Sequence, residues 1–279
     1  AKPGCCFVAV RGTKADGHQF VSAAVAAGAV AIVCEQPVNV PTNVAVLQVE
    51  SARGAAGRLA AVLIGLDAVL REARLKLIGI TGTNGKSTFC YLTQSILRAA
   101  ERPTALLGTV QYDLLARKIE ASMTTPPAAD LVAYLAEAVQ AGASHAVMEV
   151  SSHALDQGRC DGLRFAVGVF SNLTGDHLDY HGDLEHYAVA KERLFLSLAP
   201  GSAAVIHADD PAAERMARAA KSRGARVLTY SARLRGDLVA SALKSDLSGT
   251  QIVISGMGIS RTNLRLAFVG RHNVENGLA

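Results

Sequence analysis

The segment that most constrains the fold of this chain is residues 79–88, which read GITGTNGKST and directly follow the apolar run 75–78. A strand, a glycine-rich turn and a helix starting near Lys86 form the context that a phosphate-binding loop requires. Backbone N–H groups from Gly82 to Lys86 can converge on an anion at the N-terminus of this helix, where unpaired donors and the helix dipole favour negative charge. Lys86 would reach the β- and γ-phosphate oxygens, and the Ser87 hydroxyl would contact Mg²⁺.

The loop departs from the common phosphate-loop pattern, which places a glycine where this chain has Ile80. The shorter sequence GTNGKS remains, and a turn with a helix cap and an incidental lysine is the alternative interpretation. Because both the strand and the helix are present, we predict ATP or GTP binding. The residues expected to contact the nucleotide here are Gly82, Thr83, Asn84, Gly85, Lys86, Ser87 and Thr88.

Charge and cysteine content exclude other classes of protein. The formal net charge is +4 and the basic residues are scattered, so no nucleic-acid partner is expected. The five cysteines include no C-x-x-C pair, which favours free thiols and a cytoplasmic location. No apolar run reaches the ~18 residues of a membrane span, and no basic-then-apolar leader is present. The chain starts without methionine and ends within a helical pattern, so we expect a fragment of a longer protein.

Residues 1–74 read as a small α/β N-terminal domain. Residues 65–76 lack a clean period and are interpreted as the connection to the second domain. Strands are expected at 7–11, 29–34 and 44–49, and helices at 17–27 and 52–63.

Residues 75–279 read as a central domain in which strands alternate with helices. This order implies right-handed crossovers and a mostly parallel, P-loop-type central sheet flanked by helices, an α/β fold that binds ligands at the carboxyl ends of its strands. The stretch 237–268 alternates like antiparallel strands. Strands are expected at 75–81, 104–109, 146–150, 166–170, 203–206 and 226–230, and helices at 86–100, 128–141, 184–198 and 211–223.

Four stretches together resemble the central domain of the Mur ligases, the ATP-dependent amide-bond-forming enzymes of peptidoglycan precursor synthesis. Their order and spacing are most similar to the members that add the third amino acid to UDP-N-acetylmuramoyl-L-alanyl-D-glutamate, and the resemblance covers nearly the whole chain. The stretches are TGTNGKS at 81–87, MEVSSH at 148–153, SNLTGDHLDYHG at 171–182, and HY at 186–187 followed by AK at 190–191.

The opening segment resembles the nucleotide-sugar domain of the same members, through FVAV at 7–10 and GTKADG at 12–17. The resemblance implies that Thr13, Lys14 and Ala15 contact the UDP moiety. From the residues alone, a plain strand–turn–helix connection is preferred.

The two ends depart from the family pattern. The Asp-Ser-Arg stretch that normally precedes PG at 3–4 is absent. The chain ends just after GRHNVEN at 270–276, which resembles the adenine-side motif that closes the central domain. The C-terminal domain that binds the incoming amino acid is therefore expected to be missing, and the fragment is expected to bind nucleotide without completing catalysis.

The Mur resemblance implies that ATP phosphorylates the substrate carboxylate and that an amine attacks the resulting acyl phosphate. Glu149 would share a Mg²⁺ with Ser87, and His177 would hold a second Mg²⁺. Read alone, Glu149 is more often a solvated or capping residue and His177 a polar loop residue. The residues implied in catalysis are Lys86, Glu149, His177 and Lys191.

The resemblance also implies a CO₂-derived carbamate on Lys191, which would turn a cation into a carboxylate that supports the second metal. Such a lysine must lose its proton, and burial near cations promotes that loss. Read alone, Lys191, Glu192 and Arg193 form a charged helix face. His153 and His181 are interpreted as structural neighbours of the site.

The muramoyl-peptide end of the substrate is expected at Thr124, Thr125, Ser151, Gln157 and Arg159. Arg159 offers a planar fork suited to a carboxylate or a diphosphate, whereas the threonine pair can equally cap the next helix. Asn172 is either a turn residue or a site donor. Asn273 and Asn276 would read the adenine edge through their amides.

Two alternative functions stay open: a ligase like folylpolyglutamate synthase, and a non-catalytic module that only binds ATP. The KADG loop at 14–17 and EVSSH at 149–153 argue against the first. A dinucleotide-dependent hydride transferase is not expected, because no G-x-G-x-x-G follows the first strand of either domain. We expect a monomer that binds small molecules, the UDP-muramoyl dipeptide and an amino acid. That amino acid is expected to be meso-diaminopimelate, although lysine stays open because the missing domain decides.

Overall fold

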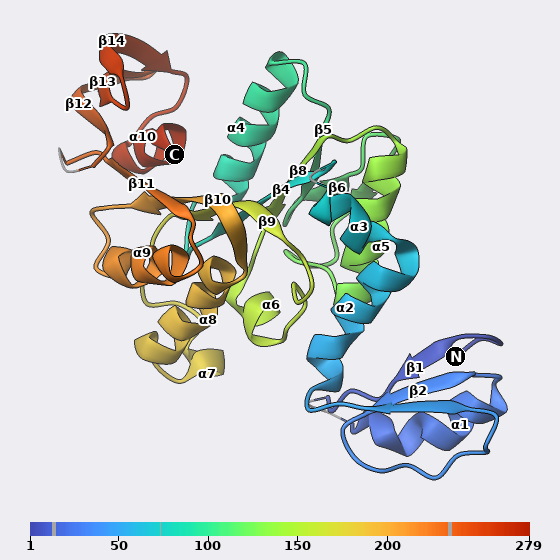
Figure 1. Cartoon of the computed structure of the whole chain (residues 1–279). Helices are drawn as coiled ribbons and strands as arrows, with labels where there is room; N and C mark the ends of the chain where they lie inside the picture. The colour runs from blue at the N-terminus through green and yellow to red at the C-terminus, as the bar shows by residue number, and fades with distance from the viewer. Residues whose placement is uncertain (13–14, 73, 234–235) are drawn as a thin grey trace.

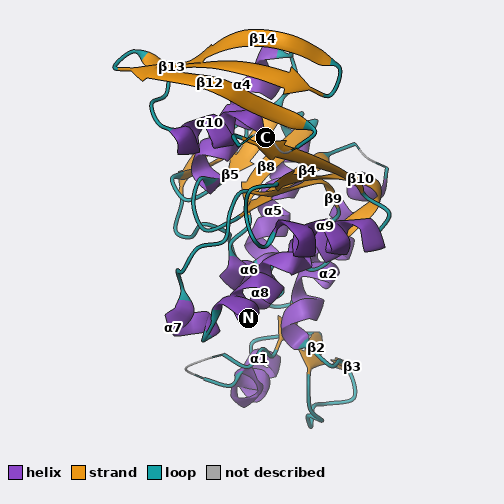
Figure 2. Ribbon diagram, turned by 90° about the vertical axis from the view of Figure 1, so that its left-hand side faces the viewer, coloured by secondary structure: helices purple, strands orange, loops and turns teal. Residues whose placement is uncertain are grey.

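The computed structural model describes residues 1–12, 15–72, 74–233 and 236–279, which fold around two separate β-sheets. Figure 1 shows a small sheet near the N-terminus, joined through α2 (Ala52–Ile64) to a much larger central sheet. In the views of Figure 1 and Figure 2 the small sheet lies beyond one end of α2, away from the central strands. Within these described ranges, no helix is long and apolar enough to cross a bilayer.

The small sheet has three parallel strands around a core of its own. Ile32 packs there with Val21 and Ala24, which project from the helix that follows the first strand. The predicted small α/β unit is confirmed, although its first strand and first helix are shorter than expected. Its elements are β1 (Cys6–Val8), η1 (Gly17–Phe20), α1 (Val21–Ala26), β2 (Ala31–Cys34) and β3 (Ala45–Gln48).

Among the described residues, the central sheet has eleven strands in the order β14-β13-β12-β11-β10-β9-β4-β8-β5-β6-β7. The strands from β12 to β5 run parallel, and antiparallel pairs close both edges. The predicted mostly parallel sheet is therefore confirmed, as is the antiparallel end of the chain. The strands are β4 (Lys76–Thr81), β5 (Thr104–Leu107), β6 (Gln111–Asp113), β7 (Lys118–Glu120), β8 (His145–Glu149), β9 (Phe165–Phe170), β10 (Leu198–His207), β11 (Arg226–Ser231), β12 (Leu238–Asp246), β13 (Gly249–Gly256) and β14 (Ile259–Leu266).

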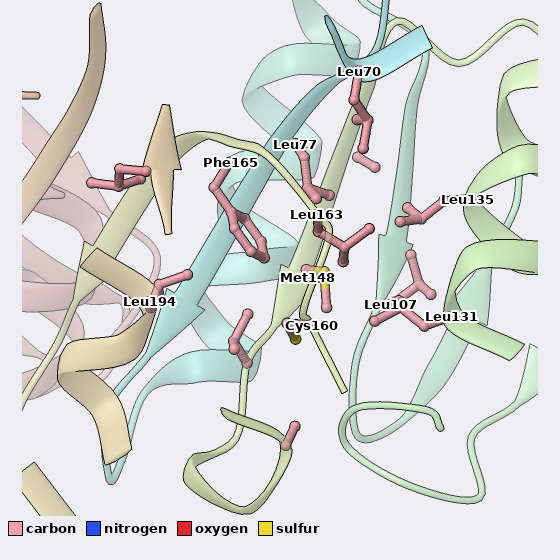
Figure 3. Close-up of a cluster of buried hydrophobic side chains, with 14 of the residues drawn as sticks. Leu70, Leu77, Leu107, Leu131, Leu135, Met148, Cys160, Leu163, Phe165 and Leu194 are labelled. Carbon is pink, nitrogen blue, oxygen red and sulfur yellow. The ribbon is translucent and has the colours of Figure 1, made fainter. Parts of the chain in front are cut away.

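Helices cover both faces of the central sheet. On one face, α4 (Lys86–Ala99) and α10 (Arg271–Leu278) contribute Phe89 and Val274 to a buried apolar cluster. The other face carries a larger cluster, part of which Figure 3 shows between strands and helices. The helices of that face are α2, α3 (Leu66–Arg71), α5 (Ala128–Gln140), α6 (Ser152–Asp156), α8 (Leu184–Leu196) and α9 (Ala213–Ser222).

Helix α2 belongs by packing to the central sheet, although it precedes residue 75 in the chain. Ala61 is buried in the central apolar cluster. Gly57 lies so close to the loop before β9 that an added Cβ would come within 2.6 Å of the Asp161 carbonyl oxygen. Since α2 precedes residue 75 and yet packs on the central sheet, the packing does not mark a domain boundary at residues 74/75, which stays a prediction.

Several short elements were not predicted. Residues 66–71, interpreted as a connection, form α3, whose Leu66 and Leu70 lie one turn apart and are both buried. The β6–β7 hairpin, α6 and α7 (Leu178–His181) were also missed. The missed helices α3, α6 and α7 span only 6, 5 and 4 residues, less than two turns each, which is too short to show a helical period.

A pair of neighbouring glycines brings α8 close to the sheet. Gly79 of β4 lies opposite Gly168 of β9. A Cβ on Gly79 would come within 2.6 Å of Phe165 and 3.0 Å of Leu194, which Figure 3 labels. A Cβ on Gly168 would meet nothing nearer than the end of the Leu198 side chain at 3.2 Å.

We expect Gly79→Ala to lower the free energy of unfolding by ~1–3 kcal/mol, because the added methyl group overpacks the core. Gly168→Ala is the matched control and is expected to cost less, since Leu198 can rotate away. Urea unfolding of both variants checks the prediction, and equal losses would contradict it.

Candidate active site

The phosphate loop between β4 and α4 needs both of its glycines. Gly85 has a φ of 86° and precedes the first residue of α4, Lys86. A Cβ on Gly85 would lie 2.4 Å from Oδ1 of Asn276, and one on Gly82 would lie 1.8 Å from Oγ of Ser171. The loop is therefore a backbone cradle without side chains on its inner turn, as an anion-binding loop at a helix N-terminus requires.

The end of β9 holds this loop in place. The backbone N–H of Asn84 donates to Oδ1 of Asn172 at 2.9 Å, and the Asn172 amide returns a bond to the Asn84 carbonyl oxygen. The Ser171 hydroxyl donates to the same carbonyl at 2.7 Å. The backbone N–H of Thr83 donates to the carbonyl of Asn172. Asn172, left open between turn residue and site donor, thus binds the loop directly.

Lys86 folds back over the phosphate loop. Its Nζ donates to the carbonyl oxygens of Gly82 at 3.0 Å and Thr83 at 2.8 Å. Burial lowers the pKa of the Lys86 ammonium from its ordinary value, while the carboxylates of Glu149 and Asp176 partly offset that effect. A cation therefore lies at the mouth of the cradle, where a terminal phosphate would exchange with the two carbonyls.

Glu149, at the end of β8, joins the loop through its side chain. Its Oε1 accepts hydrogen bonds from the Ser87 hydroxyl and from the backbone N–H of Thr109, both at 2.8 Å. Its Oε2 accepts from the Thr109 hydroxyl. Glu149 is 2% exposed, so it is a buried residue whose carboxylate is hydrogen-bonded within the site, and not a solvated surface residue.

Ser87 and Glu149 supply oxygen donors close enough to contact one cation. Mg²⁺ prefers oxygen and is commonly held by one or two carboxylates together with substrate phosphates and water. Among the residues that the structure describes, no three His, Cys, Asp or Glu side chains gather as a metal cluster. The donor set thus fits a magnesium ion whose remaining ligands are phosphate oxygens and water.

His177 and Lys191 both lie near Tyr187, which contacts the phosphate loop. His177 has a left-handed φ of 54°, uncommon outside glycine, and its ring lies 6.2 Å from that of Tyr187. The buried Nζ of Lys191 lies 4.2 Å from the centroid of the Tyr187 ring, and the Tyr187 hydroxyl contacts Thr83 of the phosphate loop. The expected catalytic residues are thus brought together.

The electrostatics of Lys191 favour its neutral form. Burial holds the pKa of Lys191 well below its ordinary value, Lys86 lowers it further, and Asp176 acts in the opposite direction. The neighbours Glu192 and Arg193 suggested that Lys191 belongs to a solvated charged face. Lys191 is instead buried.

Two further histidines complete an imidazole cluster. The His153 ring lies 5.0 Å from that of His177 and 5.5 Å from that of His181. Nε2 of His181 lies 2.9 Å from Oγ of Ser152. Burial lowers the pKa of both His153 and His181.

The residues expected at the muramoyl-peptide end form a second, adjoining cluster. The Thr125 hydroxyl donates to the carbonyl of Glu149 at 2.8 Å and accepts from the backbone N–H of Ser151 at 3.1 Å. Arg159 donates to Oε1 of Gln157 and to the carbonyl of Thr125. Oγ1 of Thr124 lies 3.1 Å from Oγ1 of Thr109. Thr125 thus braces the site rather than capping a helix, and Ser151 caps α6.

A cavity of about 440 Å³ opens beside the phosphate loop. Asn276 is buried, and the Asn273 amide donates to the carbonyl of Val269 at 2.9 Å. The residues around this cavity are Asn84, Gly85, Thr88, Ser171, Asn172, Tyr230, His272, Asn273, Glu275 and Asn276.

The expected UDP-contacting loop lies in the small sheet's unit. Thr13 and Lys14 fall outside the described residues. Ala15 is exposed, and its carbonyl accepts from the backbone N–H of Gly12 at 2.9 Å. Nothing in the described residues joins Ala15 to the phosphate loop by a hydrogen bond.

Three site residues were not singled out from the sequence: Thr109, Ser171 and Asp176. Thr109 and Ser171 follow β5 and β9, so their signal was the position just after a parallel strand, where side chains gather at one sheet edge. Asp176 precedes His177 and acts on both lysines through its charge.

A parallel sheet with a glycine cradle, a lysine and a serine at one helix start defines a P-loop-type nucleotide-binding protein. The chain belongs to the Mur ligase family. Residues 80–279 match the Mur ligase middle domain, and residues 1–67 match the Mur ligase family, catalytic domain.

Individual relatives carry the comparison further. The chain is 42% identical over 288 residues to the UDP-N-acetylmuramoyl-L-alanyl-D-glutamate–2,6-diaminopimelate ligase of Geobacter metallireducens, covering 100% of this chain and 54% of that protein. It thus spans about half the length of the curated relatives that it matches. A solved ligase of the same name superposes with a TM-score of 0.88 at 32% identity, covering 100% of this chain and 56% of that one.

Folylpolyglutamate synthases are more distant. An L. casei FPGS variant superposes with a TM-score of 0.55 at 18% identity over 80% of this chain and 64% of its own. That likeness shows a shared fold alone.

We expect Gly85→Ala to weaken nucleotide binding by at least ~10-fold, because its Cβ would displace Asn276 and strain a left-handed turn. Gly175→Ala is the control, since a Cβ there meets nothing within 4 Å. Calorimetric titration with ATP measures both, and an unchanged affinity for Gly85→Ala would show that the cradle is not the nucleotide site.

Proposed function

We propose that this chain is the sugar-nucleotide- and ATP-binding part of a ligase that adds meso-diaminopimelate to UDP-N-acetylmuramoyl-L-alanyl-D-glutamate. The observation that carries the proposal is the double engagement of Glu149. Its carboxylate contacts Ser87 of the phosphate loop, while its backbone carbonyl accepts from Thr125 of the adjoining cluster. The phosphate of one substrate and the carboxylate of the other would meet at this point.

The reaction needs a leaving group, because hydroxide leaves poorly from a carboxylate at neutral pH. Transfer of the terminal phosphoryl group of ATP to the substrate carboxylate gives an acyl phosphate, which the incoming amine attacks with loss of phosphate. Lys86 would bind the terminal phosphate oxygens, and the loop N–H groups would orient them. Mg²⁺ held by Ser87 and Glu149 would supply charge neutralisation between the two anions. His177 would hold a second Mg²⁺.

The substrate ends are assigned to two clusters. Thr124, Thr125, Ser151, Gln157 and Arg159 would bind the muramoyl peptide, with the Arg159 fork on a carboxylate or diphosphate oxygen. Thr13, Lys14 and Ala15 would contact the UDP moiety. On the nucleotide side, Thr83, Asn84, Thr88, Asn273 and Asn276 would complete the site.

Lys191 is proposed to carry a carbamate formed from CO₂. A neutral amine attacks CO₂, and the lowered pKa of Lys191 supports that form. The product is an anion, which the nearby cations Lys86 and Mg²⁺ would stabilise and which could support the second metal beside His177.

The setting we propose is a cytoplasmic, monomeric enzyme of peptidoglycan precursor synthesis that acts on small molecules and not on nucleic acid or membranes. A non-catalytic ATP-binding module is the second candidate. It would bind ATP without needing the Thr125–Arg159 cluster, so binding of the sugar nucleotide separates the two.

Calorimetric titration of the chain is expected to show binding of both ATP and the UDP-muramoyl dipeptide. Lys86→Ala should weaken ATP binding by ~10-fold or more and leave the sugar nucleotide unaffected. Arg159→Ala should do the reverse, and Arg159→Lys should restore only part of the loss because lysine lacks the fork. Binding of ATP alone would favour the module, and binding of neither would overturn both candidates.

We expect wild-type chain in ¹³C-bicarbonate to show a carbamate carbon signal by NMR that Lys191→Arg lacks. Since the amine must be neutral, the signal is retained above the lowered pKa of Lys191 and disappears as the pH falls through it. Lys118→Arg, at a side chain that is 64% exposed, is the control and should keep the signal. A spectrum without any Lys191-dependent signal would rule out the carbamate.

A further inference from the structure

The cavity beside the phosphate loop contains a carboxylate with no assigned role. Glu275 lies on α10 between Asn273 and Asn276, and it helps to line the same cavity of about 440 Å³. Its side chain is 21% exposed. Within the described parts of the chain, no residue donates a hydrogen bond to Glu275.

The surroundings of Glu275 leave its acceptor oxygens available. Nε2 of His207 lies 4.0 Å from Oε1 of Glu275, which is too far for a hydrogen bond. The other His207 nitrogen lies 2.9 Å from the carbonyl of Ser171, and the His207 ring stacks on Tyr230. The second carboxylate near His207, Asp209, already accepts from the Ser231 hydroxyl.

A carboxylate in a pocket for an anionic nucleotide repels the phosphates unless it gains something specific from the ligand. An ionised carboxylate can only accept hydrogen bonds. The groups of adenosine that donate are the ribose hydroxyls and the 6-amino group of the base. The Asn273 amide nitrogen donates to the Val269 carbonyl oxygen and, as a donor, cannot accept from these groups.

We propose that Glu275 is a specificity residue of the nucleotide site, and that it accepts a hydrogen bond from a donor of the nucleoside, either a ribose hydroxyl or the 6-amino group. This inference rests on the proposed function, because it takes the cavity as the nucleoside end of the ATP site.

The test is a calorimetric comparison of ATP with three analogues, each lacking one donor: 2′-deoxy-ATP, 3′-deoxy-ATP and inosine triphosphate. They are titrated into the wild-type chain, Glu275→Gln and Glu275→Ala, with Mg²⁺ present. Glu214→Gln is the matched control, because it removes a carboxylate from the exposed first turn of α9, outside the residues that line the cavity. The affinity ratio of ATP to each analogue cancels the general effect of removing a negative charge.

We expect one analogue to bind the wild-type chain roughly 10-fold to 100-fold more weakly than ATP, as the loss of a charge-assisted hydrogen bond implies. That ratio should fall toward one in Glu275→Ala, decrease in Glu275→Gln and stay unchanged in Glu214→Gln. The identity of the analogue tells whether the ribose or the base supplies the donor.

Two results would overturn the assignment. In the first, the wild-type chain binds ATP and all three analogues alike, which needs no variant to fold. In the second, the preference persists unchanged in Glu275→Ala. A wild-type chain that binds no nucleotide would instead overturn the proposed function itself, and this assignment with it.

Discussion

The hydrogen bonds between the end of β9 and the phosphate loop are the interactions on which the rest of the site depends. Ser171 and Asn172 bind both the N–H and the carbonyl of Asn84, so the loop is held from β9 and not only by its own glycines. With the loop held this way, the start of α4 presents Lys86 and Ser87 at fixed positions. The backbone of the cradle is then fixed by the sheet, and the Lys86 side chain is the group that would exchange partners when an anion enters.

The order of strands explains why two binding clusters share one residue. β8 and β9 flank β4, so Glu149 and Ser171 both emerge beside the loop that follows β4. Thr125 comes from the long segment before α5 and closes over the backbone of Glu149. The carboxyl ends of parallel strands lie at one edge of the sheet. At that edge the side chain of Glu149 contacts Ser87, while its backbone carbonyl oxygen accepts from Thr125.

Much of this arrangement could be predicted from the sequence. The strand–loop–helix order of residues 79–88 predicted a cradle, and strand ends predicted the neighbourhood of Glu149. The family resemblance supplied His177, Lys191 and the substrate cluster, which no local pattern could have gathered. The burial of Lys191 was not predictable from its helix, because a neighbouring Glu192 and Arg193 imitate a solvated face. The unused acceptor of Glu275 was also invisible, since only packing shows which polar groups already have partners.

The paired glycines of β4 and β9 have a consequence one turn earlier in α8. Because Gly79 and Gly168 lack side chains, Leu194 and Phe195 settle directly onto the strands. Lys191 lies about one turn away on the same helix, with its Nζ over the ring of Tyr187, whose hydroxyl contacts Thr83 of the loop. The thickness of the sheet beneath α8 thus sets the height of an ionisable amine over the phosphate cradle. Two glycines without a functional group thereby help to position a residue that carries one.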